Sequence, residues 1–153
     1  KLPPALQSAW FVPHVVTYFL AYAALFLSGA LALLALVRPR FRGRRGLDSG
    51  EAGLEVHAHR AAVFGLGALT IGLLLGGVWA KYAWGDWWSW DPKENWALAT
   101  WLAYMIYLHV RLLEGWSGRR AMWALVISFA AVVFTYLGMN LLPTAQGSLH
   151  AYR

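Results

Sequence analysis

Long apolar runs limit this chain to one class of fold. The first extends from Ala9 to Val37, about 29 residues without Asp, Glu, Lys or Arg, and the second from Ala61 to about Ala83. About 20 apolar residues suffice for a helix to cross the hydrocarbon core of a bilayer. With 59% hydrophobic and only 13% charged residues among 153, the chain is too apolar for a soluble domain of this size. The sequence therefore predicts an all-α integral membrane protein.

We expect four transmembrane helices in a single membrane domain that covers residues 1–153. Two more apolar stretches follow the first two, and a turn at residues 114–120 separates them. The predicted helices are residues 9–37, 61–83, 92–113 and 121–142, the last stopped by Pro143. In the second helix Gly72 and Gly76 are four residues apart, a spacing that lets neighbouring helices approach closely.

The basic residues predict the orientation of these helices. The connections at residues 38–60 and 111–120 contain nine arginines, whereas the opposite side holds only Lys1, Lys81, Lys93 and Arg153. The positive-inside rule makes the connections cytoplasmic, and both termini and the loop between helices two and three external. The net charge of +6 is thus explained by topology and contact with the lipid bilayer, and no nucleic acid partner is expected.

Tryptophan is concentrated in the predicted external loop and the start of the third helix. Five tryptophans occur in the thirteen residues 84–96. Tryptophan gathers at membrane interfaces as an aromatic belt, which is the alternative explanation. Four rings within seven residues instead predict a platform for a large, flat, amphipathic ligand. These four residues are Trp84, Trp87, Trp88 and Trp90.

The same segment contains the start signals of a helix. Asp91 is a favoured N-cap residue and Pro92 suits the first helical position. Glu94, three residues after the cap, completes a capping-box pattern. The aromatic segment is therefore expected to sit on the rigid end of the third helix.

Residues 84–98, Trp-Gly-Asp-Trp-Trp-Ser-Trp-Asp-Pro-Lys-Glu-Asn-Trp-Ala-Leu, resemble the WWD signature of haem-handling membrane proteins. The continuation Asp-Pro-Lys-Glu is most similar to CcsA/ResC-type cytochrome c synthases of the system II maturation pathway. The resemblance covers residues 3–152, and it implies haem b as ligand and an apocytochrome c with a CxxCH motif as substrate. It also implies a CcsB/ResB-type membrane partner and a location in a bacterial cytoplasmic or thylakoid-type membrane.

Histidines at the predicted external face are candidate iron ligands. His14 lies near the start of the first predicted helix and His150 in the tail after the fourth, so both are expected beside the tryptophan platform. Two neutral imidazoles from opposite sides can hold a haem iron axially. A histidine near a helix end is otherwise an interfacial polar residue. The resemblance assigns His14 and His150 as the axial metal ligands.

The other histidines and the lysine of the motif have two interpretations each. His109 is either an interfacial residue beside Arg111 or, by the resemblance, a membrane histidine that binds haem on its way outward. His57 and His59 are interpreted as solvated loop or helix-end residues, since two histidines make a weak metal motif. Lys93 either pairs with a haem propionate or is a surface charge.

The expected function is cytochrome c biogenesis by haem presentation for covalent thioether attachment. The candidate haem-binding residues are His14, His150, His109, Trp84, Trp87, Trp88, Trp90, Asp91 and Lys93. No residue has the pattern of a nucleophile or general base, so a cytochrome c haem lyase of this kind would act by proximity. The chain has no cysteine, which excludes a c-type cytochrome. Alternatives are a haem exporter or chaperone without ligation activity, or a non-enzymatic membrane docking subunit.

Overall fold

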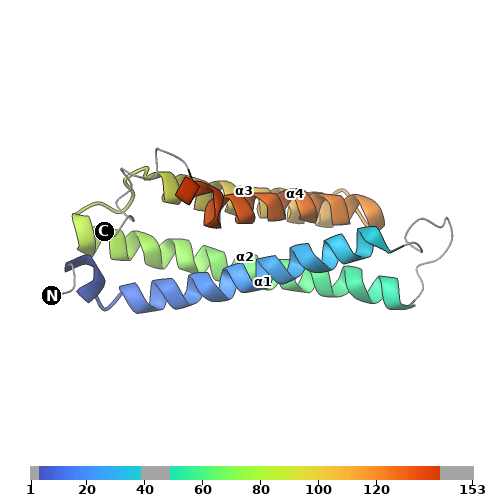
Figure 1. The fold of residues 1–153 in the computed structure, drawn as a ribbon, viewed down its shortest axis with the longest axis horizontal. Coiled ribbons are helices and arrows are strands. Elements are labelled where there is room, and N and C mark those ends of the chain that lie inside the picture. Colours follow the sequence, from blue (N-terminus) through green and yellow to red (C-terminus); the bar gives the residue numbers. More distant parts are fainter. Residues whose placement is uncertain (1–3, 39–48, 142–153) are drawn as a thin grey trace.

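The computed structural model describes residues 4–38 and 49–141, which form helices joined by short connections (Figure 1). Its long helices are α1 (Phe11–Val37), α2 (Ser49–Trp84), α3 (Pro92–Leu112) and α4 (Gly118–Tyr136). The 3-10 turns η1 (Pro4–Gln7) and η3 (Gly138–Leu141) flank them. The four helices lie side by side in an elongated bundle, with α1 mainly against α2 and α3 mainly against α4. The all-α prediction is confirmed.

The bundle has two chemically different ends. We call the end where α1 and α3 begin and α2 and α4 finish the aromatic end, because it carries the tryptophan-rich connection between α2 and α3. The other end, where α1 and α3 finish and α2 and α4 begin, is the arginine end. Its described arginines are Arg38, Arg60, Arg111, Arg119 and Arg120.

Three helices are long and apolar enough to cross a membrane: α1, residues Gly53–Trp84 of α2, and α4. They identify the chain as a membrane protein. The 21 residues of α3 extend over about 31 Å, close to the thickness of the hydrocarbon core. However, Lys93, Glu94 and Arg111 make α3 more polar than the other helices. The four-span topology therefore stays a prediction.

The predicted start of the second helix near Ala61 is wrong. The helix α2 begins at Ser49, so His57 and His59, which we interpreted as loop or helix-end residues, lie within its first turns. The reason is that this first part is amphipathic. Its buried residues recur with the helical period as Glu55, Ala58, Ala62, Leu66 and Leu69, while exposed polar side chains lower the mean hydropathy between them.

The predicted limits of the fourth helix are also shifted. We expected residues 121–142, whereas α4 covers Gly118–Tyr136 and η3 follows it. The earlier start has a physical cause in the carboxylate of Glu55, which accepts hydrogen bonds from the backbone N–H of Gly118 at 3.0 Å. Pro143, the expected stop, lies outside the described residues. The first and third predicted helices, 9–37 and 92–113, agree with α1 and α3 to within two residues.

Glu55 connects three helices at the arginine end. It is 4% exposed and forms an ion pair with Arg111 of α3 while it caps α4. Arg111 also donates a hydrogen bond to the carbonyl of Trp116 at 3.0 Å, in the connection between α3 and α4. A carboxylate at a helix N-terminus is favoured by the helix dipole. This single side chain therefore fixes the relative height of α2, α3 and α4.

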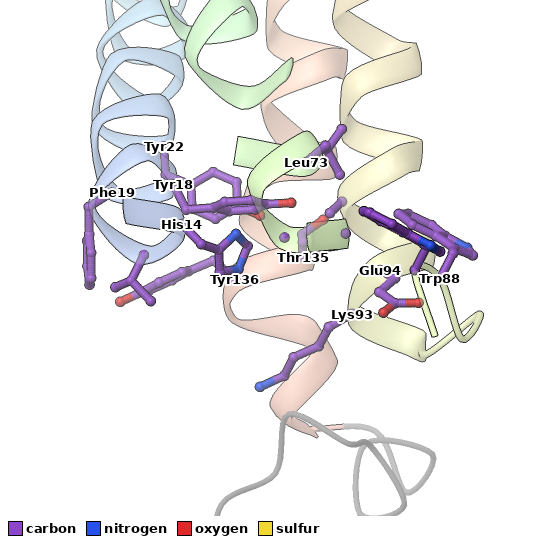
Figure 2. A pocket seen from close by; sticks show the side chains of 15 residues that line it. His14, Tyr18, Phe19, Tyr22, Leu73, Trp88, Lys93, Glu94, Thr135 and Tyr136 are labelled. Atoms are coloured by element: carbon purple, nitrogen blue, oxygen red, sulfur yellow. The ribbon is translucent and has the colours of Figure 1, made fainter. Parts of the chain in front are cut away.

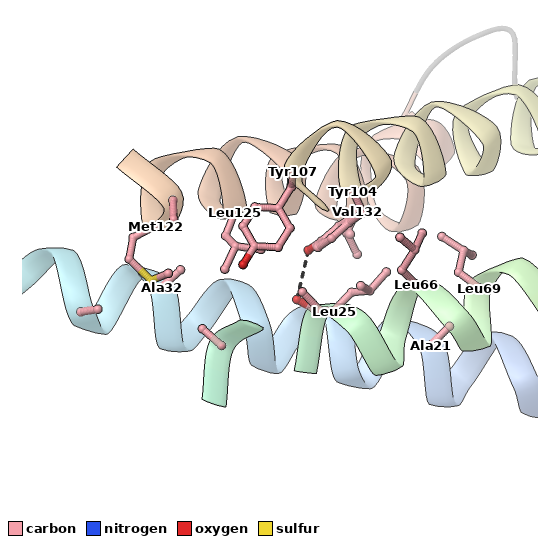
Figure 3. Packing of buried hydrophobic residues seen from close by; sticks show 14 residues of the cluster. Ala21, Leu25, Ala32, Leu66, Leu69, Tyr104, Tyr107, Met122, Leu125 and Val132 are labelled. Atoms are coloured by element: carbon pink, nitrogen blue, oxygen red, sulfur yellow. Dashed lines mark hydrogen bonds between the residues drawn. The ribbon is translucent and has the colours of Figure 1, made fainter. Parts of the chain in front are cut away.

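Small residues and polar contacts hold the helices together along the bundle (Figure 3). The buried cluster combines alanines and leucines of α1, α2 and α4 with Tyr104 and Tyr107 of α3. The hydroxyl of Ser28 donates to the carbonyl of Ala58 at 2.9 Å, and Tyr104 donates to that of Leu25 at 3.3 Å. Small residues and hydrogen bonds between helices are the usual means of association in lipid, where apolar burial gives little driving force.

Candidate functional site

The connection between α2 and α3 is held by hydrogen bonds that the motif supplies locally. Gly85 adopts a positive φ of 95° just after α2, and its carbonyl accepts a hydrogen bond from Lys81 Nζ at 2.7 Å. Trp90 also has a positive φ, 58°, which is uncommon for a residue with a bulky side chain. The backbone therefore adopts a positive φ twice between α2 and α3, at Gly85 and at Trp90.

The predicted capping box is present at the start of α3. The Asp91 carboxylate accepts from the backbone N–H of Lys93 at 3.0 Å, and Glu94 Oε2 accepts from the N–H of Asp91 at 3.2 Å. Glu94 Oε2 also accepts hydrogen bonds from the backbone N–H and the hydroxyl of Ser89. Asp91 is buried and does not line the cavity described below, so its observed role is to hold the backbone.

His14 is held in place by contacts with α2 and with its own helix. Its Nδ1 lies 3.0 Å from the carbonyl oxygen of Gly72. Its ring stacks on Trp79, with ring centroids 5.4 Å apart and planes inclined by 16°. It also packs edge-on against Tyr18, with ring centroids 4.7 Å apart. A Cβ atom on Gly76 would lie 2.7 Å from His14 Cε1, so only glycine leaves room for the imidazole. Gly72 and Gly76 therefore make room for two side chains of α1: Tyr18 packs against Gly72, and His14 packs against Gly76.

A cavity of about 290 Å³ opens beside His14 at the aromatic end (Figure 2). Residues of all four helices and the tryptophan-rich connection surround it: His14, Val15, Tyr18, Phe19, Tyr22, Leu73, Gly76, Gly77, Trp87, Trp88, Lys93, Glu94, Ala97, Thr135 and Tyr136. In Figure 2 the His14 ring lies among Tyr18, Tyr136 and Thr135, and the Lys93 side chain points away from Glu94. An apolar and aromatic wall with a few polar groups is typical of sites for small organic ligands.

The four tryptophans of the predicted platform take different positions. Trp87 and Trp88 line the cavity. Trp84 packs edge-on against the buried Trp79, with ring centroids 4.7 Å apart. Trp90 is 70% exposed, and its ring packs edge-on against Trp88 with the ring centroids 6.1 Å apart. Two rings therefore line the cavity, although 59% of Trp87 is exposed. The Trp84 ring packs behind His14, and Trp90 is exposed outside the cavity.

The other predicted ligands lie apart from this cavity. His150 is outside the described residues. His109 is exposed near the end of α3, 17 residues after Pro92 and so about 26 Å along the helix, at the arginine end. His57 is exposed, with Nδ1 2.6 Å from the carbonyl of Gly53, and His59 Nδ1 lies 2.9 Å from the hydroxyl of Tyr107. The structure thus brings together His14, Trp87, Trp88 and Lys93.

Sequence comparison identifies the family of this membrane protein. The chain matches the family described as Cytochrome C assembly protein over residues 1–145. It belongs to the cytochrome c assembly protein family. The resemblance to CcsA-type proteins that the tryptophan-rich segment carries is confirmed.

Curated members of the family align with nearly the whole chain. The cytochrome c biogenesis protein CcsA of Chlamydomonas reinhardtii is 43% identical over 155 residues, covering 99% of this chain and 42% of that protein. CcsA proteins of Prochlorococcus marinus and of a Synechococcus strain are 38% and 39% identical, again over 99% of this chain and over 56% of each relative. The chain spans about half the length of the curated relatives it matches.

Several residues of the cavity escaped the sequence analysis. Tyr18 and Tyr22 follow His14 at intervals of four residues, so one face of α1 carries all three rings into the cavity. Thr135 and Tyr136 come from the end of α4, and the Thr135 hydroxyl lies 2.8 Å from that of Thr100. The spacing of His14, Tyr18 and Tyr22 could have predicted this face of α1, because the glycines Gly72 and Gly76 of α2 have the same spacing of four residues and pack against Tyr18 and His14. Nothing in the local sequence points to Thr135.

Proposed function

We propose that this chain acts in cytochrome c biogenesis as the core that holds haem at the aromatic end and presents it to apocytochrome c. Family membership supports the pathway, since the curated relatives are named cytochrome c biogenesis proteins. The cavity beside His14 supports haem binding at the aromatic end, because an imidazole, several aromatic side chains and the cation of Lys93 line it.

The observation that carries the proposal is the hydrogen bond between His14 Nδ1 and the carbonyl of Gly72. A carbonyl oxygen only accepts, so the neutral imidazole carries its proton on Nδ1 and its lone pair on Nε2. Histidines that bind metals commonly have their other nitrogen fixed in this way, which orients the ring and raises its basicity. This hydrogen bond supports the proposal that His14 would bind iron through Nε2.

The remaining groups would orient the substrate haem. Lys93 is the cation of the cavity and would pair with a propionate, while Trp87 and Trp88 would cover an apolar face of the macrocycle. We propose His150 as the second axial ligand, on the resemblance alone. In thioether formation the thiol S–H bond adds across a vinyl group: sulfur bonds one carbon and the hydrogen ends on the other. No net oxidant is needed, and the protein supplies proximity.

The test is the visible spectrum of the purified protein, oxidised and reduced. We expect sharp bands of bis-histidine haem in the wild type, and weakened or broadened bands in His14→Ala and in His150→Ala. His57→Ala is the matched control, because His57 is an exposed histidine at the arginine end and should leave the bands unchanged. A wild type that stays colourless after haem is added would contradict the haem site, and would favour a docking role.

Ligation and transport are separated by co-expressing an apocytochrome with a CxxCH motif. Covalent haem on that cytochrome, lost in His14→Ala, supports the synthase function. Bound haem without covalent attachment, even with a CcsB/ResB-type partner present, supports export or chaperoning.

We further propose that α3 is the fourth membrane span and that the aromatic end is external. The length of α3 and its packing along α4 support this, and so do the five described arginines at the other end, Arg38, Arg60, Arg111, Arg119 and Arg120. The chain has no cysteine, so Asp86→Cys and Glu114→Cys each introduce one thiol at an exposed position at opposite ends. A membrane-impermeant maleimide added outside intact cells should label the first and spare the second. The reverse pattern would invert the topology.

A further inference from the structure

A second cavity, of about 880 Å³, lies between α1 and α2 toward the arginine end. Its walls are apolar: Ala24, Leu27 and Leu31 come from one face of α1, and Leu54, Ala61 and Phe64 from one face of α2. In Figure 1 the two helices cross near their middles and diverge toward both ends, the arginine end included. Leu27 and Phe64 are 55% and 61% exposed, so the groove opens on the outer surface of the described bundle.

Basic side chains line the groove along much of its length, since Arg60 lies about 10 Å along α2 from Gly53 and about 6 Å before Phe64. Arg38, His57 and Arg60 line it together with the apolar side chains. Neither Arg38 nor Arg60 forms an ion pair with a described residue, in contrast to Arg111, which is paired with Glu55. The groove thus joins an apolar wall to positive charges that no described carboxylate neutralises.

The length of the groove matches one leaflet of a bilayer. From Gly53 to Phe64 the α2 wall covers 12 residues, and the 11 steps between them amount to about 16 Å along the helix axis. Half of a hydrocarbon core of about 30 Å has nearly the same length. Basic pockets between membrane helices on the cytoplasmic side are places where anionic lipid headgroups bind.

We propose that this groove binds one anionic glycerophospholipid, with an acyl chain along Leu27, Leu31 and Phe64 and the phosphate at Arg38 and Arg60. A lipid fits better than a flat macrocycle such as haem, because Phe64 is the only Phe, Tyr or Trp side chain that lines the groove, whereas six such side chains line the cavity beside His14. The proposal does not depend on haem binding at the aromatic end.

Native mass spectrometry of the 153-residue chain in detergent tests this proposal. The probes are palmitoyl-oleoyl phosphatidylglycerol, which is anionic, and phosphatidylcholine with the same acyl chains. We expect tighter binding of phosphatidylglycerol. The dissociation constant of phosphatidylglycerol should rise about fivefold in Arg38→Gln, and about fivefold in the separate variant Arg60→Gln. Binding of phosphatidylcholine should stay unchanged in both. Arg119→Gln is the matched control, an exposed arginine at the same end that does not line the groove.

Filling the groove gives an independent measurement. Ala61→Phe puts a ring into the wall and should reduce retained phosphatidylglycerol, whereas Val63→Phe, on an exposed position outside the groove, should not. The proposal is overturned if both lipids bind equally, if Arg119→Gln weakens phosphatidylglycerol binding as much as Arg60→Gln, or if Ala61→Phe retains it fully. It is also overturned if His57→Ala lowers haem content and leaves lipid binding intact, since haem would then be the occupant.

Discussion

The two ends of the bundle are held together by different forces. At the arginine end one buried carboxylate, Glu55, binds an arginine of α3 and the first N–H of α4. At the aromatic end ring contacts of His14, Trp79 and Trp84 and the capping box of α3 connect the elements. Charge connects α2, α3 and α4 at the arginine end, where the groove lies outside these contacts, between α1 and α2. Rings and bare glycine surfaces surround the cavity at the aromatic end, where we propose that haem binds.

This contrast predicts the largest stability effect at the arginine end. Glu55→Gln leaves Arg111 without its ionic partner and weakens the cap of α4. We expect a loss of about 3 kcal/mol in the free energy of unfolding, toward the lower limit for breaking a buried ion pair, because Arg111 is partly exposed. Denaturant unfolding in detergent, followed by tryptophan fluorescence, measures it.

Glu114→Gln is the control for this substitution. Glu114 is an exposed carboxylate in the connection between α3 and α4, and its loss should change stability by less than about 0.5 kcal/mol. Equal effects of the two substitutions would mean that the Glu55 contacts do not hold this end.

At the aromatic end a single methyl group should disturb both stability and ligand binding. Gly76→Ala places a Cβ 2.7 Å from His14 Cε1 and 3.0 Å from Nδ1, so the imidazole must move away from Gly72. We expect a loss of about 1–3 kcal/mol from overpacking, and a broadened haem spectrum. Spectra and unfolding curves of the same preparation measure both.

Gly67→Ala provides the opposite expectation on the same helix. Nothing lies within 4 Å of a Cβ at Gly67, so alanine should stabilise α2 by about 0.5–1 kcal/mol through its higher helix propensity. If Gly76→Ala behaves like Gly67→Ala, His14 does not depend on the glycine surface.

The α3 cap and the cavity beside His14 differ in how far the sequence predicts them. The cap of α3 was predictable, because Asp91, Pro92 and Glu94 act on neighbouring N–H groups and need no tertiary contact. The cavity was predictable only in part. His14 and the tryptophans carry recognisable chemistry, but their neighbours depend on the height at which α1 meets α2, and no local pattern sets that height.

The missed beginning of α2 has a different cause. Its first turns carry Glu55, His57 and Arg60, which resemble a polar loop when hydropathy is averaged. The period of the buried residues from Glu55 to Leu69 contains the helix signal, since an amphipathic helix is recognised by spacing and not by mean hydropathy. A periodicity count over residues 49–60 would have extended the helix.

The cap of α3 should contribute less to the free energy of unfolding than the Glu55 ion pair or the packing of His14 on Gly76. Asp91→Ala removes the acceptor for the Lys93 N–H and should cost about 1 kcal/mol, while Asp91→Asn keeps an acceptor and should cost less. Hydrogen exchange of the Lys93 amide reports the cap directly. If Asp91→Ala leaves that exchange rate unchanged, the cap contributes nothing to the order of the tryptophan-rich connection.

The smallest expected effect concerns a polar contact between α2 and α3 near the arginine end. Tyr107→Phe removes the hydroxyl that lies 2.9 Å from His59 Nδ1. Hydrogen bonds between membrane helices couple by about 0.6 kcal/mol on average, because the unfolded chain finds other partners. A double-mutant cycle of Tyr107→Phe with His59→Ala should give this value. A coupling near zero would leave Glu55 as the main polar connection at this end, whereas a coupling as large as the Glu55→Gln effect would mean that the arginine end depends on a network and not on one carboxylate.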